Sequence, residues 1–163
     1  MAIFNLGSIN IDHFYRLPHL VRPSETLSAQ HYSQGLGGKG ANQSVAMAKA
    51  GAEVFHIGAI NENNGDYLTR IQNIGIHTDH LHCVDTPTGH GIVMIDDNSG
   101  ENQIVVYPGA NQHISEEMID NALKEATDND WALCQNETNN TAYFLHKAKH
   151  KNMKLCYSAA PFV

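Results

Sequence analysis

The sequence runs Gly35-Leu36-Gly37-Gly38-Lys39-Gly40-Ala41-Asn42 where a polar, extended segment gives way to a helical pattern. Glycines let a ligand approach the backbone closely, and the start of a helix offers it free N–H groups. Lys39 and Asn42 are three residues apart, so they share one side of the helix start. The glycine cluster is therefore a candidate ligand-binding loop, with a tight strand-to-helix connection as the alternative.

Two phosphate-binding motifs can be compared with this cluster. A P-loop requires GxxxxGK followed by Ser or Thr, whereas here Gly40 follows Lys39, which excludes it. Gly35, Gly37 and Gly40 satisfy the GxGxxG spacing, but they follow the polar Tyr32-Ser33-Gln34 and not the buried strand of a dinucleotide fold. Dinucleotide-dependent oxidoreduction is thus a disfavoured alternative.

Outward from the loop, strand-like and helix-like patterns alternate. Residues 2–7 form a short apolar run typical of a buried strand, and Ala41, Val45 and Ala48 follow helical spacing up to Gly51. Further strands are expected at 53–60, 80–84, 131–135 and 154–158, and further helices at 65–73, 115–127 and 141–149. This alternation predicts an α/β fold whose largely parallel sheet has helices on its faces.

Four segments depart from the apolar strand pattern. Residues 11–17 and 28–34 are polar and mixed, which predicts exposed strands of a small separate sheet, a flap beside the core. Residues 88–95 and 103–107 flank an acidic, glycine-containing connection, which predicts a hairpin. No internal repeat or long linker divides the 163 residues, so we expect one domain.

Composition excludes several classes of protein. The net charge is −7 with only ten scattered Lys and Arg residues, which argues against a nucleic-acid partner. No run of about 18 apolar residues and no signal peptide is visible, so we expect a cytoplasmic protein without a membrane partner. The sequence has three cysteines, Cys83, Cys134 and Cys156. An odd number without CxxC spacing predicts buried free thiols.

Three polar residues follow apolar strands at positions where open α/β sheets bind ligands. Asn10 and Asp12 come directly after the first strand and point to one side of an extended chain. A carboxylate accepts hydroxyl hydrogens and an amide both donates and accepts, so this pair suits a polyol, with an Asx turn as the alternative. Glu137 follows the apolar residues 131–134 and is either a ligand-binding group or a solvated loop residue.

A histidine-rich stretch suggests a metal hypothesis. His77, His80 and His82 precede Cys83, and imidazole and thiolate are zinc ligands. No second pair of ligands occurs at the spacing of a zinc finger, so the alternative is an exposed approach to a strand.

Several spaced motifs, taken in order, resemble the ribokinase-like carbohydrate kinases of the pfkB family. They are Gly7-Ser8-Ile9-Asn10-Ile11-Asp12, Ser24-Glu25-Thr26, Gly37-Gly38-Lys39-Gly40-Ala41-Asn42-Gln43, Thr88-Gly89 and Pro108-Gly109-Ala110-Asn111. The resemblance covers nearly the whole chain and implies a Rossmann-type α/β core with a small β lid over the sugar. By the same resemblance, residues 11–34 and 88–107 supply the lid strands, and a homodimer forms through the lid.

The resemblance also implies which residues contact the sugar. These are Asn10, Asp12, Gly38, Lys39, Asn42 and Glu137, with Gly91 and Val93 on its apolar side. The implied reaction transfers the γ-phosphoryl group of ATP, with Mg²⁺ as cofactor and K⁺ as a further ion, to a primary sugar hydroxyl. D-ribose is the expected substrate; another sugar, a nucleoside, or a non-catalytic sugar- or nucleotide-binding module is the alternative.

The family's catalytic aspartate lies in a GAGD motif, which these 163 residues lack, so we name no catalytic residue. We expect this chain to be the N-terminal, sugar-binding part of a protein roughly twice as long, with the nucleotide pocket, the cation site and catalysis in a later part. The chain alone is then expected to be inactive. Ser158 stands where ribokinases carry the Asn of NPAP, toward the phosphate end, which makes it a doubtful cofactor contact.

Overall fold

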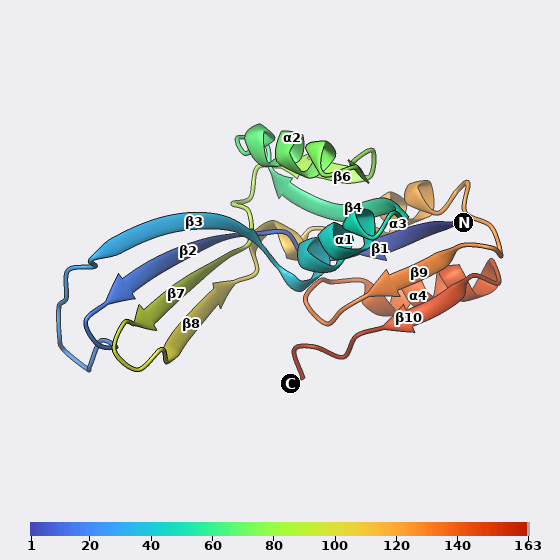
Figure 1. Cartoon of the computed structure of the whole chain (residues 1–163). Coiled ribbons are helices and arrows are strands. Elements are labelled where there is room, and N and C mark those ends of the chain that lie inside the picture. Colours follow the sequence, from blue (N-terminus) through green and yellow to red (C-terminus); the bar gives the residue numbers. More distant parts are fainter. Residues whose placement is uncertain (163) are drawn as a thin grey trace.

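A parallel sheet forms the centre of the molecule in the computed structural model, which describes residues 1–162 (Figure 1). Its strands are β1 (Ala2–Leu6), β4 (Glu53–Asn61), β5 (Ile76–His77), β6 (Leu81–Val84), β9 (Trp131–Cys134) and β10 (Lys154–Tyr157). The order is β10-β9-β1-β4-β5, with β6 also paired to β4, and every pairing is parallel. The predicted α/β fold is therefore confirmed.

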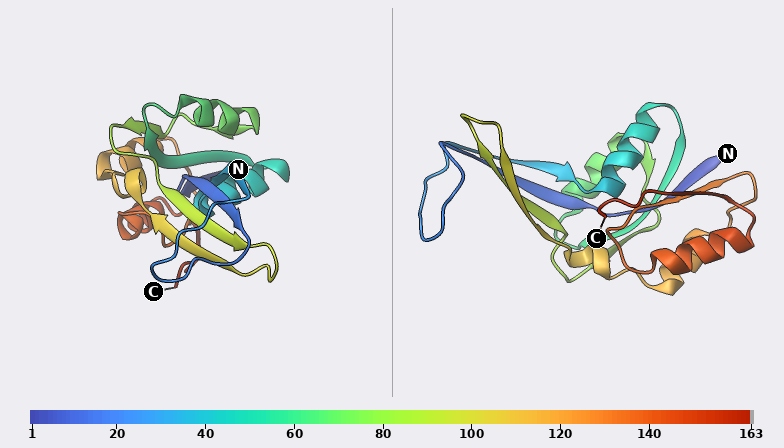
Figure 2. Two further views of the ribbon diagram at one scale, coloured as in Figure 1. Left: turned by 90° about the vertical axis from the view of Figure 1, so that its left-hand side faces the viewer. Right: turned by 90° about the horizontal axis from the view of Figure 1, so that it is seen from below.

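Helices cover both faces of this sheet because its strands are apolar on both sides (Figure 2). Ala2, Phe4 and Leu6 of β1 belong to the apolar cluster beneath α3 (Glu116–Ala122) and α4 (Thr141–His150). The opposite face packs against α1 (Lys39–Lys49) and α2 (Gly65–Asn73), whose Ala41 and Ile71 join a second cluster. The two clusters fix the start of α1 over the ends of the central strands.

A second, four-stranded sheet projects from the core (Figure 1), and we call it the small sheet. Its order is β3 (His31–Gly37), β2 (Asn10–Leu17), β7 (His90–Asp96) and β8 (Asn102–Tyr107). Strand β2 is antiparallel to β3 and parallel to β7, and β7 is antiparallel to β8. The chain thus contributes two separate segments to the small sheet, as the flap and the hairpin predicted.

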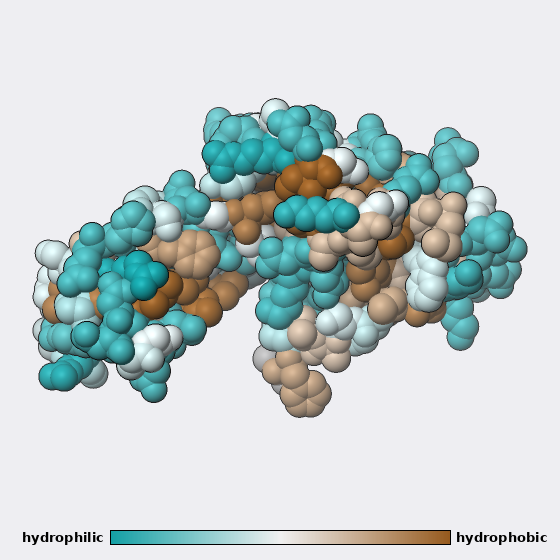
Figure 3. Space-filling view, in the orientation of Figure 1, coloured by the Kyte–Doolittle hydropathy of each residue, from teal (hydrophilic) through white to brown (hydrophobic). Residues whose placement is uncertain are grey.

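Side chains alternate between the two faces of the small sheet. Its inner face carries Asp12 of β2 and Val93 of β7, and its outer face carries His13 and the paired Ile92. Figure 3 shows apolar surface among hydrophilic neighbours on the small sheet. Four apolar side chains from its two faces are exposed. They are Ile92, Ile104, Val105 and Val106, with exposed fractions of 40%, 56%, 60% and 58%.

The structure corrects several details of the sequence prediction. The strand expected at 28–34 is β3, which begins at His31 and continues into the glycine cluster as far as Gly37. The short strand β5 and the 3-10 helix η1 (Gly109–Gln112) were not expected. Helix α3 ends at Ala122 and not near Thr127. Residues after it form turns, and the Asp130 carboxylate accepts the Thr127 N–H at 2.9 Å just before β9. These differences leave the order of the larger elements unchanged.

The three cysteines are free, as predicted, but only Cys134 is buried. Burial raises the pKa of the Cys134 thiol to about 12. Cys156 is exposed because β10 lies at the edge of the sheet, and Cys83 is exposed as well, so the prediction of burial was wrong for both. Within residues 1–162, no helix is long and apolar enough to cross a membrane.

Candidate functional site

A hollow of about 180 Å³ lies between the inner face of the small sheet and the start of α1, and we call it the inner hollow. It is lined by Asn10, Asp12, Gly38, Lys39, Asn42, Gly91, Val93, Ile104, Val106 and Glu137. Every residue that the resemblance assigned to sugar contact is in this set. The structure therefore brings them together, although their role in binding stays a prediction.

A second hollow of about 390 Å³ adjoins the first and shares Asn10, Lys39, Val106 and Glu137 with it. It extends past η1 to Pro161. Ser158 lines neither hollow, and its N–H donates to the carbonyl of Cys134 at 2.9 Å. The role of Ser158 as a cofactor contact therefore stays a prediction.

The glycine loop is shaped by a close approach of two backbones. A Cβ atom on Gly7 would lie 2.5 Å from the Cα of Gly40, so neither position has room for a side chain. Gly38 has a φ of 89°, a left-handed value that favours glycine, and it caps α1. The Ala41 N–H donates to the Ser8 carbonyl at 2.9 Å. The start of α1 is consequently fixed directly against the end of β1.

Glu137 ties the loop after β9 to the glycine loop. Its Oε2 accepts the Lys39 backbone N–H at 2.8 Å and also the Ser8 hydroxyl, and its Oε1 lies 3.1 Å from the Lys39 ammonium. The Glu137 side chain is only 17% exposed, against 43% for Lys39. The carboxylate is therefore held in place, while the ammonium can reach into the inner hollow.

Asp12 faces the hollow between two glycines. Its Oδ1 accepts the Gly91 N–H at 3.0 Å, and a side chain on Gly37 would collide with its other carboxyl oxygen. Burial raises the pKa of Asp12, with a smaller rise from the negative charge of Glu137, and the Gly91 hydrogen bond opposes both. The carboxylate is thus partly desolvated and has acceptor capacity left for hydroxyl groups.

Asn111 is a site residue that sequence reasoning did not name as one. Its Nδ2 donates to Asn10 Oδ1 at 2.8 Å and its Oδ1 accepts the Ile9 N–H at 2.9 Å, so it fixes the orientation of the Asn10 amide. Ser8, Ile104 and Val106 were also missed. The available signal was that Ser8 and Asn111 belong to the quoted motifs.

Beneath the glycine loop lies a buried polar network. Gln135 Nε2 donates to Asn5 Oδ1 at 2.8 Å, and Asn5 Nδ2 donates to Ser44 Oγ at 2.8 Å and to the Gly40 carbonyl at 2.9 Å. The Ser44 hydroxyl lies 2.8 Å from His56 Nδ1. Within residues 1–162, Gln135 Oε1 is one of two buried side-chain oxygens or nitrogens without a partner. The network links β1, the middle of β4 and the end of β9 to α1.

The direction of these bonds fixes the form of His56. Its Nε2 lies 3.0 Å from the Gly7 carbonyl, which can only accept, so Nε2 carries the hydrogen and Nδ1 accepts from Ser44. Burial lowers the pKa of His56 to about 4, and the Gly7 bond opposes that change. A neutral imidazole therefore supports the backbone of Gly7, the residue that touches Gly40.

The inner hollow suits an uncharged polyol. Asn10 and Asp12 supply acceptor and donor groups, and the Lys39 ammonium, paired with Glu137, supplies further donors. Val93, Ile104 and Val106 form an apolar wall on the small sheet that can pack against C–H groups. In the part of the chain that the structure describes, no three His, Cys, Asp or Glu side chains converge, in the histidine-rich stretch from His77 or elsewhere.

Comparison with known proteins agrees with this geometry. Residues 2–159 match the model of the pfkB family carbohydrate kinase. A ribokinase of Haemophilus influenzae is 37% identical over 161 residues, which cover 96% of this chain and 52% of that protein. This chain thus spans about half the length of such relatives.

Two solved structures are similar over almost the whole chain. A ribokinase of Cryptococcus neoformans var. grubii serotype A, in complex with ADP, matches with a TM-score of 0.85 and 33% identity over 99% of this chain and 50% of its own. A ribokinase of Arabidopsis thaliana, complexed with ribose and ATP, matches with a TM-score of 0.80 and 26% identity over 98% of this chain and 54% of its own.

Proposed function

This chain belongs to the pfkB family of carbohydrate kinases, and from that membership we propose that it forms the sugar-binding part of an ATP-dependent sugar kinase. The proposed reaction transfers the γ-phosphoryl group of ATP to a primary hydroxyl of the sugar. The observation that carries this proposal is the convergence of Asn10, Asp12, Lys39 and Glu137 on one hollow beneath the small sheet.

In this proposal the chain's own residues bind and orient the sugar. Asp12 and Asn10 receive vicinal hydroxyl groups, and Lys39 donates to a third oxygen from the opposite wall. The apolar inner face of the small sheet covers the sugar and excludes water that would otherwise accept the phosphoryl group. Held this way, the sugar presents one hydroxyl for phosphorylation, and positioning supplies much of the rate acceleration.

ATP and Mg²⁺ are proposed as the phosphoryl donor and its metal, but the described residues do not supply their site. Within residues 1–162 no three metal-ligating side chains come together, and Ser158 lines neither the inner nor the adjoining hollow. Accordingly, we assign neither ATP, Mg²⁺ nor K⁺ to residues of this chain and derive no step through a metal.

D-ribose is the proposed substrate, giving ribose 5-phosphate. The support is that the similar proteins of Haemophilus influenzae and Arabidopsis thaliana are named ribokinases. The test is a phosphorylation assay of the complete protein with ATP, Mg²⁺ and D-ribose, D-fructose or adenosine. We expect D-ribose to give the highest kcat/KM. A higher value for fructose or adenosine, or no turnover of D-ribose, would refute D-ribose as the substrate. No turnover of any of these or of other sugars and nucleosides would refute the kinase assignment.

A second copy of the chain is the proposed partner of the small sheet. Ile104 and Val106 are more than half exposed although they lie on the inner face, and such an apolar surface favours association. Sedimentation of the protein is expected to give a dimer, and Val106→Asp is expected to give a monomer. A monomeric wild type at micromolar concentration would refute this partner.

A further inference from the structure

The largest hollow described in this protein, of about 490 Å³, lies on the outer face of the small sheet, away from the proposed sugar site. We call it the outer hollow. It is lined by Ile11, His13, Gln34, Asn61, Asn63, Asn64, Tyr67, Pro87, Thr88 and His90. Ile11 and His13 alternate along β2 with Asn10 and Asp12, so the two sites use opposite faces of one strand.

The wall formed by the core has polar groups that the fold leaves free. Asn61 is fully used, because its Nδ2 donates to the carbonyls of residues 84–86 and its Oδ1 accepts the Asn63 N–H. Asn64 is different: its Oδ1 accepts the Thr88 hydroxyl at 2.7 Å, which leaves the two Nδ2 hydrogens for a ligand. The Tyr67 hydroxyl has no partner among residues 1–162 and lines the same space.

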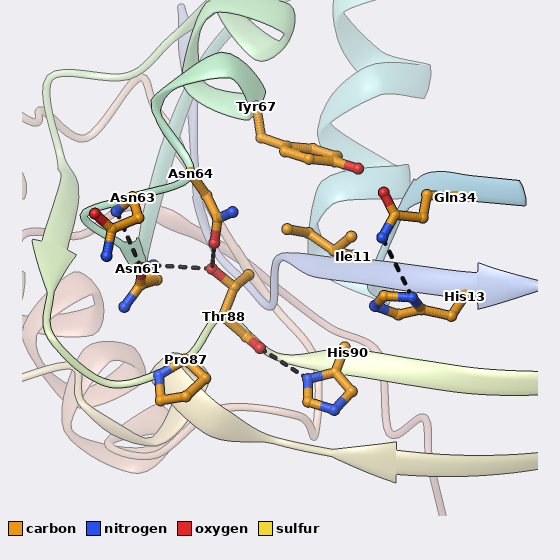
Figure 4. Close-up of a pocket in the computed structure, with 10 residues that line it drawn as sticks. All are labelled: Ile11, His13, Gln34, Asn61, Asn63, Asn64, Tyr67, Pro87, Thr88 and His90. Carbon is orange, nitrogen blue, oxygen red and sulfur yellow. Dashed lines mark hydrogen bonds between the residues drawn. The ribbon is translucent and has the colours of Figure 1, made fainter.

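The wall formed by the small sheet offers the complementary groups. Gln34 Nε2 lies 3.3 Å from His13 Nδ1, which leaves the Gln34 carbonyl oxygen as an acceptor. The same ring nitrogen of His13 lies 2.9 Å from the Tyr32 hydroxyl. His90 donates from Nδ1 to the Thr88 carbonyl at 3.1 Å, so its Nε2 is an acceptor. Figure 4 shows the amides of Asn64 and Gln34 on opposite walls, with Tyr67 and Ile11 between them.

The chemistry of this lining defines the ligand. No Lys, Arg, Asp or Glu lines the outer hollow, so nothing there compensates the charge of a phosphate or an ammonium group. The free donors and acceptors belong to amide and imidazole groups, whose directions are set by their bonds to the protein. Such fixed groups match a ligand whose own donors and acceptors are fixed, as they are in a planar ring, and Tyr67, Pro87 and Ile11 add apolar surface to the lining.

We propose that the outer hollow binds a neutral nitrogenous heterocycle with adjacent C=O and N–H groups, namely a nucleobase. Asn64 and the Tyr67 hydroxyl donate to it, and Gln34 and His90 accept from it. Because Asn64 and Tyr67 belong to the core while Gln34 and His90 belong to the small sheet, a bound base bridges the two sheets. It therefore favours one position of the small sheet over the proposed sugar site.

The test uses free bases, which carry no sugar and so do not engage the proposed sugar site. Uracil, hypoxanthine and adenine are titrated into ¹⁵N-labelled protein, and backbone amide shifts are followed by NMR. We expect saturable shifts at residues 63–67 and 88–91. Tyr67→Phe keeps the buried ring and removes the hydroxyl, and Gln34→Leu removes the acceptor; each is expected to raise Kd about 2- to 10-fold, the effect of one neutral hydrogen bond.

The matched controls are Tyr143→Phe on α4 and Gln103→Leu on β8, which lie outside the hollow and are expected to leave Kd unchanged. The proposal is overturned if none of the three bases shifts these amides, or if the two control variants weaken binding as much as the two site variants. It is equally overturned if D-ribose or ribose 5-phosphate, and no base, shifts residues 63–67. Failure of the sugar kinase assignment would leave this result unaffected, because no sugar or ATP is needed.

Discussion

Lys39 and Glu137 are 98 residues apart in the sequence and meet twice, through the Lys39 backbone N–H at 2.8 Å and through its ammonium at 3.1 Å. The first contact fixes the glycine loop to the loop after β9. The second holds a charged group at the mouth of the inner hollow. Because the Lys39 side chain is 43% exposed, water screens the ion pair, and its contribution to stability is small.

Replacing Lys39 is therefore expected to weaken the binding of D-ribose while leaving the stability of the fold almost unchanged. In Lys39→Met the free energy of unfolding changes by less than about 1 kcal/mol, while the affinity for D-ribose falls about tenfold or more, since a charged donor is lost. Urea denaturation and calorimetry measure the two quantities. The control is Lys147→Met, which breaks the similar ion pair with Asp120 far from the hollow. Equal loss of affinity in both variants would contradict the role of Lys39.

The contact between Gly7 and Gly40 gives a second prediction. An alanine in place of a helical glycine usually stabilises a helix, by up to about 1 kcal/mol. In Gly40→Ala the new methyl group meets the backbone of Gly7 and Ser8, so we expect a destabilisation of about 1–3 kcal/mol. Gly65→Ala, at the start of α2, meets nothing within 4 Å and is expected to be neutral or slightly stabilising. Thermal denaturation of the two variants checks the difference.

Much of this fold was predictable because its signals are local. The helices at Lys39–Lys49 and Gly65–Asn73 follow from apolar spacing and a terminal glycine, and both were confirmed. The two-residue strand β5 was not predictable, because so short a segment has no periodicity. Cys156 lies in an apolar run but on an edge strand, and strand order is not visible in the pattern.

The site was predictable only in part. Asn10, Asp12 and Glu137 follow strands and stand in recognisable motifs. The roles of other residues depend on contacts that no local pattern encodes: Asn111 reaches Asn10 across 101 positions, and Gln135 reaches Asn5 across 130. His56 and Asn5 lie in apolar strands, so the sequence alone does not distinguish them from core residues.

His56 predicts a pH dependence of stability. Its pKa is about 4 in the folded protein, against 6.5 for an ordinary histidine, so between these values the unfolded chain binds more protons. The contribution of neutral His56 to the free energy of unfolding is complete above pH 6.5. It is lost as the pH falls toward 4, by about 3 kcal/mol in total. We expect His56→Gln to be less stable than wild type at pH 7.5 and to lose less stability between pH 7.5 and 4.5.

Urea denaturation at several pH values measures this slope. The exposed His146 provides the control, and His146→Gln is expected to follow the wild-type slope. If the stability of His56→Gln fell with pH as steeply as that of the wild type, the pKa of His56 would not be lowered in the folded protein. The assignment of His56 as a buried neutral imidazole would then be wrong.

Asp12 predicts a conflict between function and stability. Its pKa is raised, chiefly by burial, so its charged form is less favourable in the folded protein than in the unfolded chain. Asp12→Asn removes the charge and keeps an oxygen for the Gly91 N–H, and we expect it to raise the free energy of unfolding at pH 7. Chemical denaturation at pH 7 checks this, and a lower stability would show that the carboxylate is stabilising.

The most direct test of the central claim is calorimetric titration of D-ribose into the protein and into Asp12→Ala, with Asp66→Ala on α2 as the control. We expect D-ribose to bind the wild type and Asp66→Ala equally, and binding to Asp12→Ala to fall at least about tenfold, the cost of a charged hydrogen-bond acceptor. Absence of ribose binding to the wild type, or unchanged binding to Asp12→Ala, would contradict the assignment of the inner hollow as a sugar site.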